Sequence, residues 1–216
     1  MPGTTVVLVR HAQSRWNAAG LLQGQHGPGL SARGRAQAAA TAAALAHRHP
    51  AVSAIVRSDL PRVAETAAPT ERALGLMATP DPRLRELDLG SWTGLRHDDV
   101  RAVQAEDFAR WLGGADVDSH GGETFSDLQA RMTAVLDDLA AAHTGDSVLV
   151  FSHGGPIRIA AATALGLPAG GIDRLEPPGN CSLTVLTWHP GGAGARIVTY
   201  NQRPCEDCAS EDCPFY

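Results

Sequence analysis

Two short aliphatic runs, each followed closely by a histidine, constrain the fold of this chain most strongly. Residues 6–9 read Val-Val-Leu-Val and lead directly into Arg10 and His11. Residues 148–151 read Val-Leu-Val-Phe, and His153 follows after one serine. Runs of this kind are typical of strands covered on both faces in a parallel sheet. Open α/β sheets bind ligands at the carboxyl ends of their strands, so we expect both histidines to lie at one crevice.

The remaining pattern alternates strands with helices. Amphipathic spacing predicts helices at 31–47, 60–74, 98–111 and 123–143, with an interruption near Pro69 in the second. Further strands are expected at 51–56, 182–188 and 196–200. This order predicts an α/β fold, a three-layer α/β/α sandwich with a mostly parallel central sheet. We expect one domain over residues 1–203 and a Cys- and acid-rich tail over residues 204–216.

Charge and composition narrow the class of ligand. The net charge is −5, which offers no basic face for nucleic acid or for an anionic membrane. All 18 basic residues are arginines, so lysine Schiff-base chemistry is excluded. Arginine is suited to binding phosphate through two parallel hydrogen bonds. We therefore expect a small-molecule phosphate ester as ligand, and the sequence leaves the oligomeric state open.

Cysteine usage and the absence of a targeting pattern predict a cytoplasmic location. The chain has neither a membrane-spanning apolar run nor the pattern of a signal peptide. Cys181 lies in the body of the chain, and Cys205, Cys208 and Cys213 lie in the tail. Three thiols are one fewer than a structural zinc site normally has. The tail is thus open to three interpretations: a solvated extension, a metal site or a disulfide-bonded segment.

Four motifs, taken in order, resemble the histidine phosphatase superfamily, in the branch that contains the cofactor-dependent phosphoglycerate mutases. They are Arg10-His11 with Asn17, the stretch Ser-Asp-Leu-Pro-Arg-Val-Ala-Glu-Thr-Ala at 58–67, Leu-Arg-Glu-Leu-Asp-Leu-Gly-Ser-Trp-Thr-Gly at 84–94, and Ser-His-Gly-Gly at 152–155. The likeness extends over residues 4 to about 200. One departure is Ala12, where relatives usually carry glycine.

The resemblance implies a site without metal or cofactor. His11 would be the nucleophile and would become a phosphohistidine. Arg10 and Arg62 would clamp the phosphoryl oxygens, and His153 would donate to the same group. Glu86 would protonate the leaving alkoxide. The two arginines should also depress the pKa of His11, keeping it unprotonated.

Three further residues are candidates for substrate binding. Asn17 would donate to a phosphoryl oxygen, Gln23 would contact the leaving group, and Glu123 would line the pocket mouth. Residues 120–124, which include Glu123, read equally well as a loop followed by a helix start. A solitary histidine at a strand end is usually a polar cap, and only the combined motifs favour catalysis.

These residues predict a phosphomonoesterase that hydrolyses small phosphorylated metabolites through a phosphohistidine. Two alternatives remain open at this stage. One is mutase-like phosphoryl transfer, which the short spacing of 67 positions between Glu86 and His153 disfavours because the mutases carry an insertion there. The other is a catalytically silent phosphate-binding module. The presence of the complete set of expected catalytic residues disfavours it: Arg10, His11, Arg62, Glu86 and His153.

Overall fold

The computed structural model describes residues 2–49, 51–118, 121–191 and 194–204. Within these ranges, a six-stranded sheet runs in the order β3-β2-β4-β1-β5-β6. Its strands are β1 (Thr4–Arg10), β2 (Ala54–Arg57), β3 (Ala78–Pro80), β4 (Ser147–Ser152), β5 (Leu183–Trp188) and β6 (Arg196–Gln202). The first four in this order are parallel, whereas β5 is antiparallel to both β1 and β6. The predicted mostly parallel sheet is confirmed.

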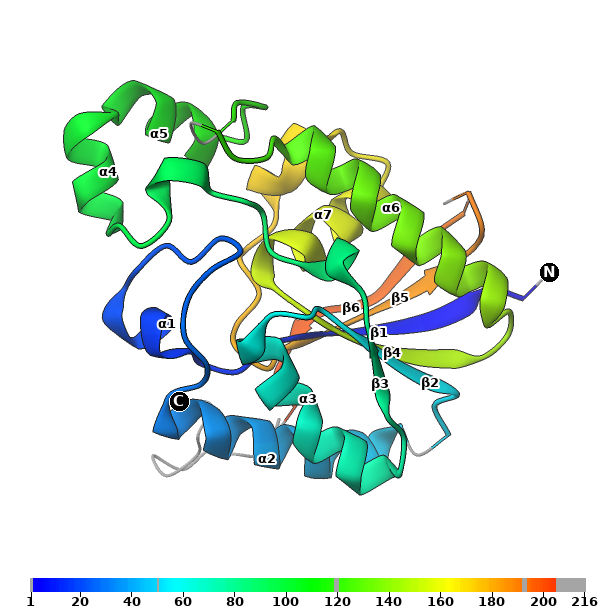
Figure 1. Ribbon diagram of the computed structural model, residues 1–216. Helices are drawn as coiled ribbons and strands as arrows, with labels where there is room; N and C mark the ends of the chain where they lie inside the picture. The colour runs from blue at the N-terminus through cyan, green and yellow to red at the C-terminus, as the bar shows by residue number, and fades with distance from the viewer. Residues whose placement is uncertain (1, 50, 119–120, 192–193, 205–216) are drawn as a thin grey trace.

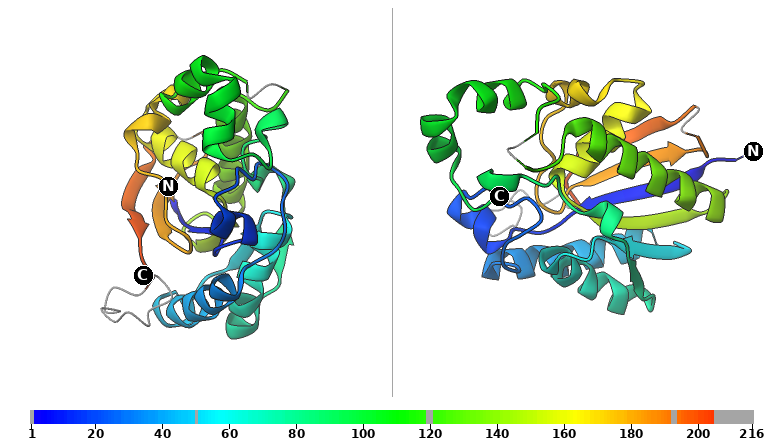
Figure 2. Two further views of the ribbon diagram at one scale, coloured as in Figure 1. Left: turned by 90° about the vertical axis from the view of Figure 1, so that its left-hand side faces the viewer. Right: turned by 45° about the horizontal axis from the view of Figure 1, so that its top comes forward.

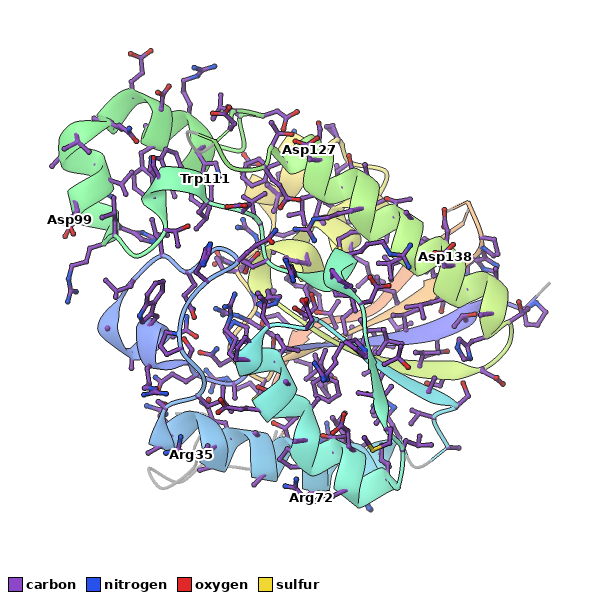
Figure 3. All side chains as sticks on the ribbon, in the orientation of Figure 1. Arg35, Arg72, Asp99, Trp111, Asp127 and Asp138 are labelled. Atoms are coloured by element: carbon purple, nitrogen blue, oxygen red, sulfur yellow. The ribbon has the colours of Figure 1, made fainter. Side chains whose placement is uncertain are left out.

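Helices cover both faces of this sheet. In Figure 1, α2 (Ala32–Arg48) and α3 (Pro61–Leu74) lie below it, and α6 (Phe125–Ala142) and α7 (Gly154–Ala164) lie above it. The views in Figure 2 show the same three layers. Figure 3 shows charged side chains on the outer faces of these helices, namely Arg35, Arg72, Asp127 and Asp138. The α/β/α sandwich predicted from the sequence is therefore confirmed.

Shorter elements gather beyond the end of the sheet. Figure 1 shows α1 (Arg15–Ala19), α4 (His97–Val103) and α5 (Ala105–Leu112) on the side toward which β1 and β4 run. The 3₁₀ helices are η1 (Pro82–Leu84), η2 (Gly90–Trp92) and η3 (Ala169–Arg174). No helix among the described residues is both long and apolar enough to cross a membrane.

The alternation of β1 side chains explains why its apolar run is unbroken. Val6 and Leu8 belong to the core cluster under α6 and α7. Val7 and Val9 belong to the cluster on the opposite face, together with Leu45 of α2. A strand segment buried on both faces needs apolar residues at every position. Thr4 and Thr5 precede this apolar run, and Arg10 follows it at the carboxyl end of the strand.

The start of α2 fixes the loop that follows β1. Ser31 caps the helix by accepting a hydrogen bond from the Gly34 N–H at 3.0 Å. The Gly34 backbone lies against the loop, because a Cβ atom there would lie 2.0 Å from the carbonyl oxygen of Gln13. Ser31 also donates its backbone N–H to that carbonyl, at 2.9 Å. The glycine therefore allows a close approach that any other residue would block.

Two helix predictions need correction. The single helix expected over residues 98–111 is in fact α4 and α5, which meet at Gln104 with φ −141° and ψ 48°. The Gln104 side chain accepts a hydrogen bond from the Trp92 indole, and Val100 and Phe108 on either side of the break are both buried. The interruption expected near Pro69 is also wrong, because α3 continues through that residue. Burial of Val63 and of neighbouring α3 residues holds the helix despite the missing N–H.

Candidate active site

The two strand-end histidines lie side by side. β1 and β4 are neighbours in the sheet, and their register pairs Arg10 with Ser152. The next residues, His11 and His153, therefore leave the sheet at the same point. Their ring centroids are 5.1 Å apart with an interplanar angle of 63°, and both side chains are buried. The predicted crevice at the carboxyl ends of the strands thus brings both histidines together.

The surroundings of His11 define which ring nitrogen is reactive. Its Nδ1 lies 2.7 Å from the carbonyl oxygen of Ala12, so Nδ1 carries the proton and donates it. Nε2 then keeps its lone pair. The backbone is held by the Asn180 amide, which donates to the His11 carbonyl at 2.9 Å, and by Thr66 Oγ1, which accepts from the Ala12 N–H at 3.0 Å. Ala12 does not have the left-handed conformation that would require glycine.

His153 is held in the complementary tautomer. Its Nε2 lies 2.9 Å from Ser58 Oγ. The same oxygen accepts from the Leu60 N–H at 3.3 Å, and we assign the serine hydroxyl as the donor to Nε2. The ring then carries its proton on Nδ1, which is buried and has no hydrogen-bond partner among the described residues. Nδ1 is consequently a donor awaiting an acceptor.

Arg10 and Arg62 are held by backbone carbonyls rather than by carboxylates. Arg62 donates from Nη1 to the His26 carbonyl and from Nη2 to the Gly24 carbonyl, both at 2.7 Å. Arg10 donates from Nη1 to the carbonyl of Pro178. The Nε of each arginine is buried without a partner in the described part of the chain. Among the described residues neither arginine has a carboxylate within 4.0 Å, although the Glu86 charge acts on both. Two cations with unused donors form a site for an anion.

Burial and these two cations keep both histidines neutral. The pKa of His11 lies well below its ordinary value, mainly because of desolvation and then because of the positive charges of Arg62 and Arg10. Desolvation followed by Arg62 lowers the pKa of His153 in the same way. The predicted effect of the arginines on His11 is confirmed, although burial is the larger cause.

This neutrality makes folding stability depend on pH. In the unfolded chain both histidines take up protons below about pH 6.5, whereas in the folded protein they remain neutral to lower pH. The free energy of unfolding should therefore fall as pH drops below about 6.5, by up to about 1.4 kcal/mol per pH unit for each histidine. Urea unfolding at several pH values between about 7.5 and 5 measures this slope. His11→Asn should flatten it, and an unchanged slope would contradict the assignment.

Glu86 faces the same cavity from a loop on the α6–α7 side. Its Oε1 accepts hydrogen bonds from the backbone N–H of Leu87 at 2.9 Å and of Gly155 at 3.1 Å. A Cβ atom on Gly155 would lie 2.3 Å from Oε1, so only glycine leaves room for the carboxylate. Arg131 donates to the Glu86 carbonyl at 2.9 Å and holds the loop.

A cavity of about 350 Å³ joins these groups. Its lining includes Arg10, His11, Asn17, Arg62 and Glu86, and Gln23 also lines it. The Asn17 Oδ1 accepts from the Ser14 N–H at 3.2 Å and from Asn180 at 3.3 Å, which leaves its amide NH₂ as a donor. The Gln23 Oε1 accepts from Ser14 Oγ at 2.6 Å, which likewise leaves its NH₂ available.

Two predicted site residues lie outside the cavity lining. His153 is buried beside His11 and is not among the residues that line the cavity. Glu123 accepts hydrogen bonds from Arg131 Nε at 2.7 Å and from the Asp88 N–H at 2.9 Å. Its carboxylate thereby fixes the loop that bears Glu86, and its contact with substrate stays a prediction. Of the tail, Cys205, Cys208 and Cys213 lie outside the described residues.

Sequence reasoning missed three residues at the site. Asn180 lies in an irregular segment before β5, and no sequence pattern points to its bond with His11. Trp111 lines the cavity from α5 and is labelled in Figure 3. Arg158 lines it from α7, three residues after Gly155. Helical spacing alone would have placed Arg158 on the same face as Gly155.

Comparison with known proteins agrees with this geometry. The sequence profile of the histidine phosphatase superfamily (branch 1) matches residues 6–203. The chain belongs to this superfamily. It is 35% identical over 201 residues to glucosyl-3-phosphoglycerate phosphatase of Mycobacterium tuberculosis, covering 88% of this chain and 89% of that protein. It is 34% identical over 163 residues to phosphoserine phosphatase 1 of Hydrogenobacter thermophilus, covering 75% and 76% respectively.

A solved structure extends the likeness to the fold of this histidine phosphatase. The mycobacterial glucosyl-3-phosphoglycerate phosphatase in complex with inorganic phosphate superposes with a TM-score of 0.84 at 32% identity, covering 93% of this chain and 98% of that one. The present protein is a phosphatase of small phosphorylated metabolites, as the sequence predicts.

Proposed function

We propose that the protein hydrolyses small phosphate monoesters in two steps through a phosphohistidine on Nε2 of His11. The observation that carries this proposal is the buried neutral His11, whose Nδ1 is bound to the Ala12 carbonyl. In the described part of the chain its Nε2 has no hydrogen-bond partner, and the charges of Arg62 and Arg10, whose Nε atoms are unpartnered there, act on its ring. A neutral imidazole can attack phosphorus in line, and it leaves readily when water attacks next.

In the first step, the His11 Nε2–P bond forms and the ester P–O bond breaks. Arg10 and Arg62 bind the equatorial phosphoryl oxygens, and Asn17 and the Nδ1–H of His153 donate to them. The Glu86 carboxyl group gives its proton to the departing alkoxide, so that an alcohol leaves. In the second step, the Glu86 carboxylate accepts a proton from water as water attacks phosphorus. Inorganic phosphate leaves, and His11 and Glu86 return to their starting forms.

The substrates of the relatives indicate the size of the ester. Glucosyl-3-phosphoglycerate and phosphoserine are named as the substrates of two of them. We propose that this protein acts on esters of the same kind, whose alcohol occupies the part of the cavity beyond Glu86. The cytoplasmic location and the division into a domain over residues 1–203 and a tail over residues 204–216 remain predictions.

Trapping the phosphoenzyme tests the proposal. A brief incubation with ³²P-labelled substrate in the presence of EDTA, stopped with alkali, should leave label on a peptide containing His11. The label should be lost in acid, as expected for phosphohistidine. Hydrolysis of the labelled enzyme should release inorganic phosphate. Transfer of the label to the alcohol product instead would indicate a mutase. Label on another residue, or label that requires a divalent ion, would contradict the proposed mechanism.

A further inference from the structure

Arg158 is a cavity-lining cation that the proposed mechanism does not use. It lies on α7 four residues after Gly154 and three after Gly155, and all three residues line the cavity. Residues with this spacing share a helix face, and one helical turn rises about 5.4 Å. Arg158 therefore lies roughly one turn beyond the Gly155 N–H that holds the Glu86 carboxylate.

The Arg158 guanidinium retains unused donor capacity. It donates from Nε to the Leu175 carbonyl at 3.1 Å and from Nη2 to the Ile172 carbonyl at 2.6 Å. In the described part of the chain, Nη1 has no hydrogen-bond partner and no carboxylate comes within 4.0 Å of the group. Burial lowers the pKa of Arg158, and four groups oppose this effect through space, in this order: Tyr200, Glu86, Asp173 and Glu176. A half-buried cation of this kind is stabilised when an anion enters the cavity beside it.

The cavity that Arg158 lines also has an apolar lining. Its apolar side chains include Leu21, Trp111, Leu112, Phe125, Ile172 and Pro177. Arg10 and Arg62 act on His11 through their charges, whereas Arg158 is not among the charges that shift the pKa of His11. The cavity lining thus holds two arginines that act on His11 through their charges and a third, Arg158, on which the Glu86 charge acts. An apolar wall lowers the local dielectric, so that an ion pair formed there is stronger than in water.

We propose that Arg158 binds a carboxylate on the leaving group, which makes the preferred substrates carboxylated phosphate monoesters. This inference rests on the proposed function. Glu86 and Arg158 line the same cavity and act on each other through their charges, so a leaving group whose ester oxygen lies at Glu86 can present its carboxylate to the free Nη1. A planar guanidinium binds a carboxylate with better geometry than a hydroxyl group.

A matched pair of substrates tests this proposal. 3-Phosphoglycerate and glycerol 3-phosphate share a three-carbon skeleton and differ in a carboxylate against a hydroxymethyl group. The unmodified protein should have a kcat/KM at least about tenfold higher for 3-phosphoglycerate. Arg158→Gln should lower kcat/KM for 3-phosphoglycerate by roughly 10- to 100-fold, mainly through KM, because the contact is remote from the reacting atoms. Hydrolysis of glycerol 3-phosphate and of p-nitrophenyl phosphate should change little.

Two further variants separate recognition from support of the fold. Arg158→Lys keeps a cation and should retain part of the preference. Arg174→Gln removes an exposed cation from η3, the segment that Arg158 contacts, and should leave the preference unchanged. Equal losses on all three substrates with a lower Tm would overturn the proposal by assigning Arg158 a purely structural role.

The unmodified protein provides an independent check that does not depend on any variant folding. The absence of a preference for 3-phosphoglycerate would overturn the proposal on its own. If p-nitrophenyl phosphate is still hydrolysed through labelled His11 while the preference is missing, only the role of Arg158 fails. If no phosphohistidine forms, the proposed function itself fails.

Discussion

Replacing His11 by alanine is expected to lower kcat by more than about 10³-fold. Removing a single stabilising donor usually costs about 10²–10³-fold, and loss of a nucleophile costs more because the two-step route is no longer available. The phosphate-binding groups Arg10 and Arg62 remain, so substrate should still bind. Steady-state kinetics with p-nitrophenyl phosphate, together with the labelling experiment on the variant, measures this effect.

A neighbouring histidine provides the control. The side chain of His26 is exposed, and only its backbone carbonyl holds Arg62. His26→Ala keeps that carbonyl and should leave turnover within a few-fold of the unmodified protein. Thermal unfolding of both variants separates lost chemistry from lost structure. If His11→Ala retains a tenth of the activity, or still acquires acid-labile label, another residue is the nucleophile.

Glu86→Gln is expected to have a large effect that depends on the leaving group. General acid catalysis typically contributes about 10²–10⁴-fold, and an alkoxide needs the proton far more than p-nitrophenolate does. Turnover of glycerol 3-phosphate should fall within that range, whereas turnover of p-nitrophenyl phosphate should fall by less than about tenfold. The glutamine oxygen can accept the same bonds from the Leu87 and Gly155 N–H groups, so the loop should keep its position.

The ratio of the two losses decides the role of Glu86. Equal losses on both esters would mean that this side chain acts only by positioning other groups. Asp88→Asn is a suitable control, since Asp88 lies two residues along the same loop but does not line the cavity. That variant should show no selective loss on the alkyl ester.

The sequence was sufficient for the centre of the site because strand ends determine its position. Apolar runs without interruption identified β1 and β4 as buried strands, and parallel strands deliver their next residues to one edge. His11 and His153 therefore could be placed together before their 5.1 Å separation was known. The roles expected for Arg10, Arg62 and Glu86 came from the family resemblance rather than from spacing. Their location in one cavity agrees with those roles.

Contacts between distant segments could not be predicted in the same way. The helical periodicity of the sequence continues through Gln104, so it gives no sign of the break between α4 and α5. The break is accompanied by a tertiary contact, the hydrogen bond from the Trp92 indole to the Gln104 side chain. From the sequence, Glu123 could equally well have lined the mouth of the pocket. In the structure its carboxylate forms an ion pair with Arg131 of α6. Asn180 reaches the His11 carbonyl across 169 positions, a distance over which single-sequence patterns carry no information.

The separation of α4 and α5 from the sandwich has a consequence for how this enzyme can be diversified. These helices stand beyond the sheet, and the segment from His97 to Leu112 contributes His97, Trp111 and Leu112 to the cavity lining. The reacting groups His11 and Glu86 come from other parts of the chain, as do Glu123 and Arg131, which hold the Glu86 loop. Exchanging α4 and α5 between homologous chains would therefore change the lining that meets the leaving group and leave the phosphate-binding residues unaltered. Libraries confined to α4 and α5 could be screened for new esters without altering the reacting groups.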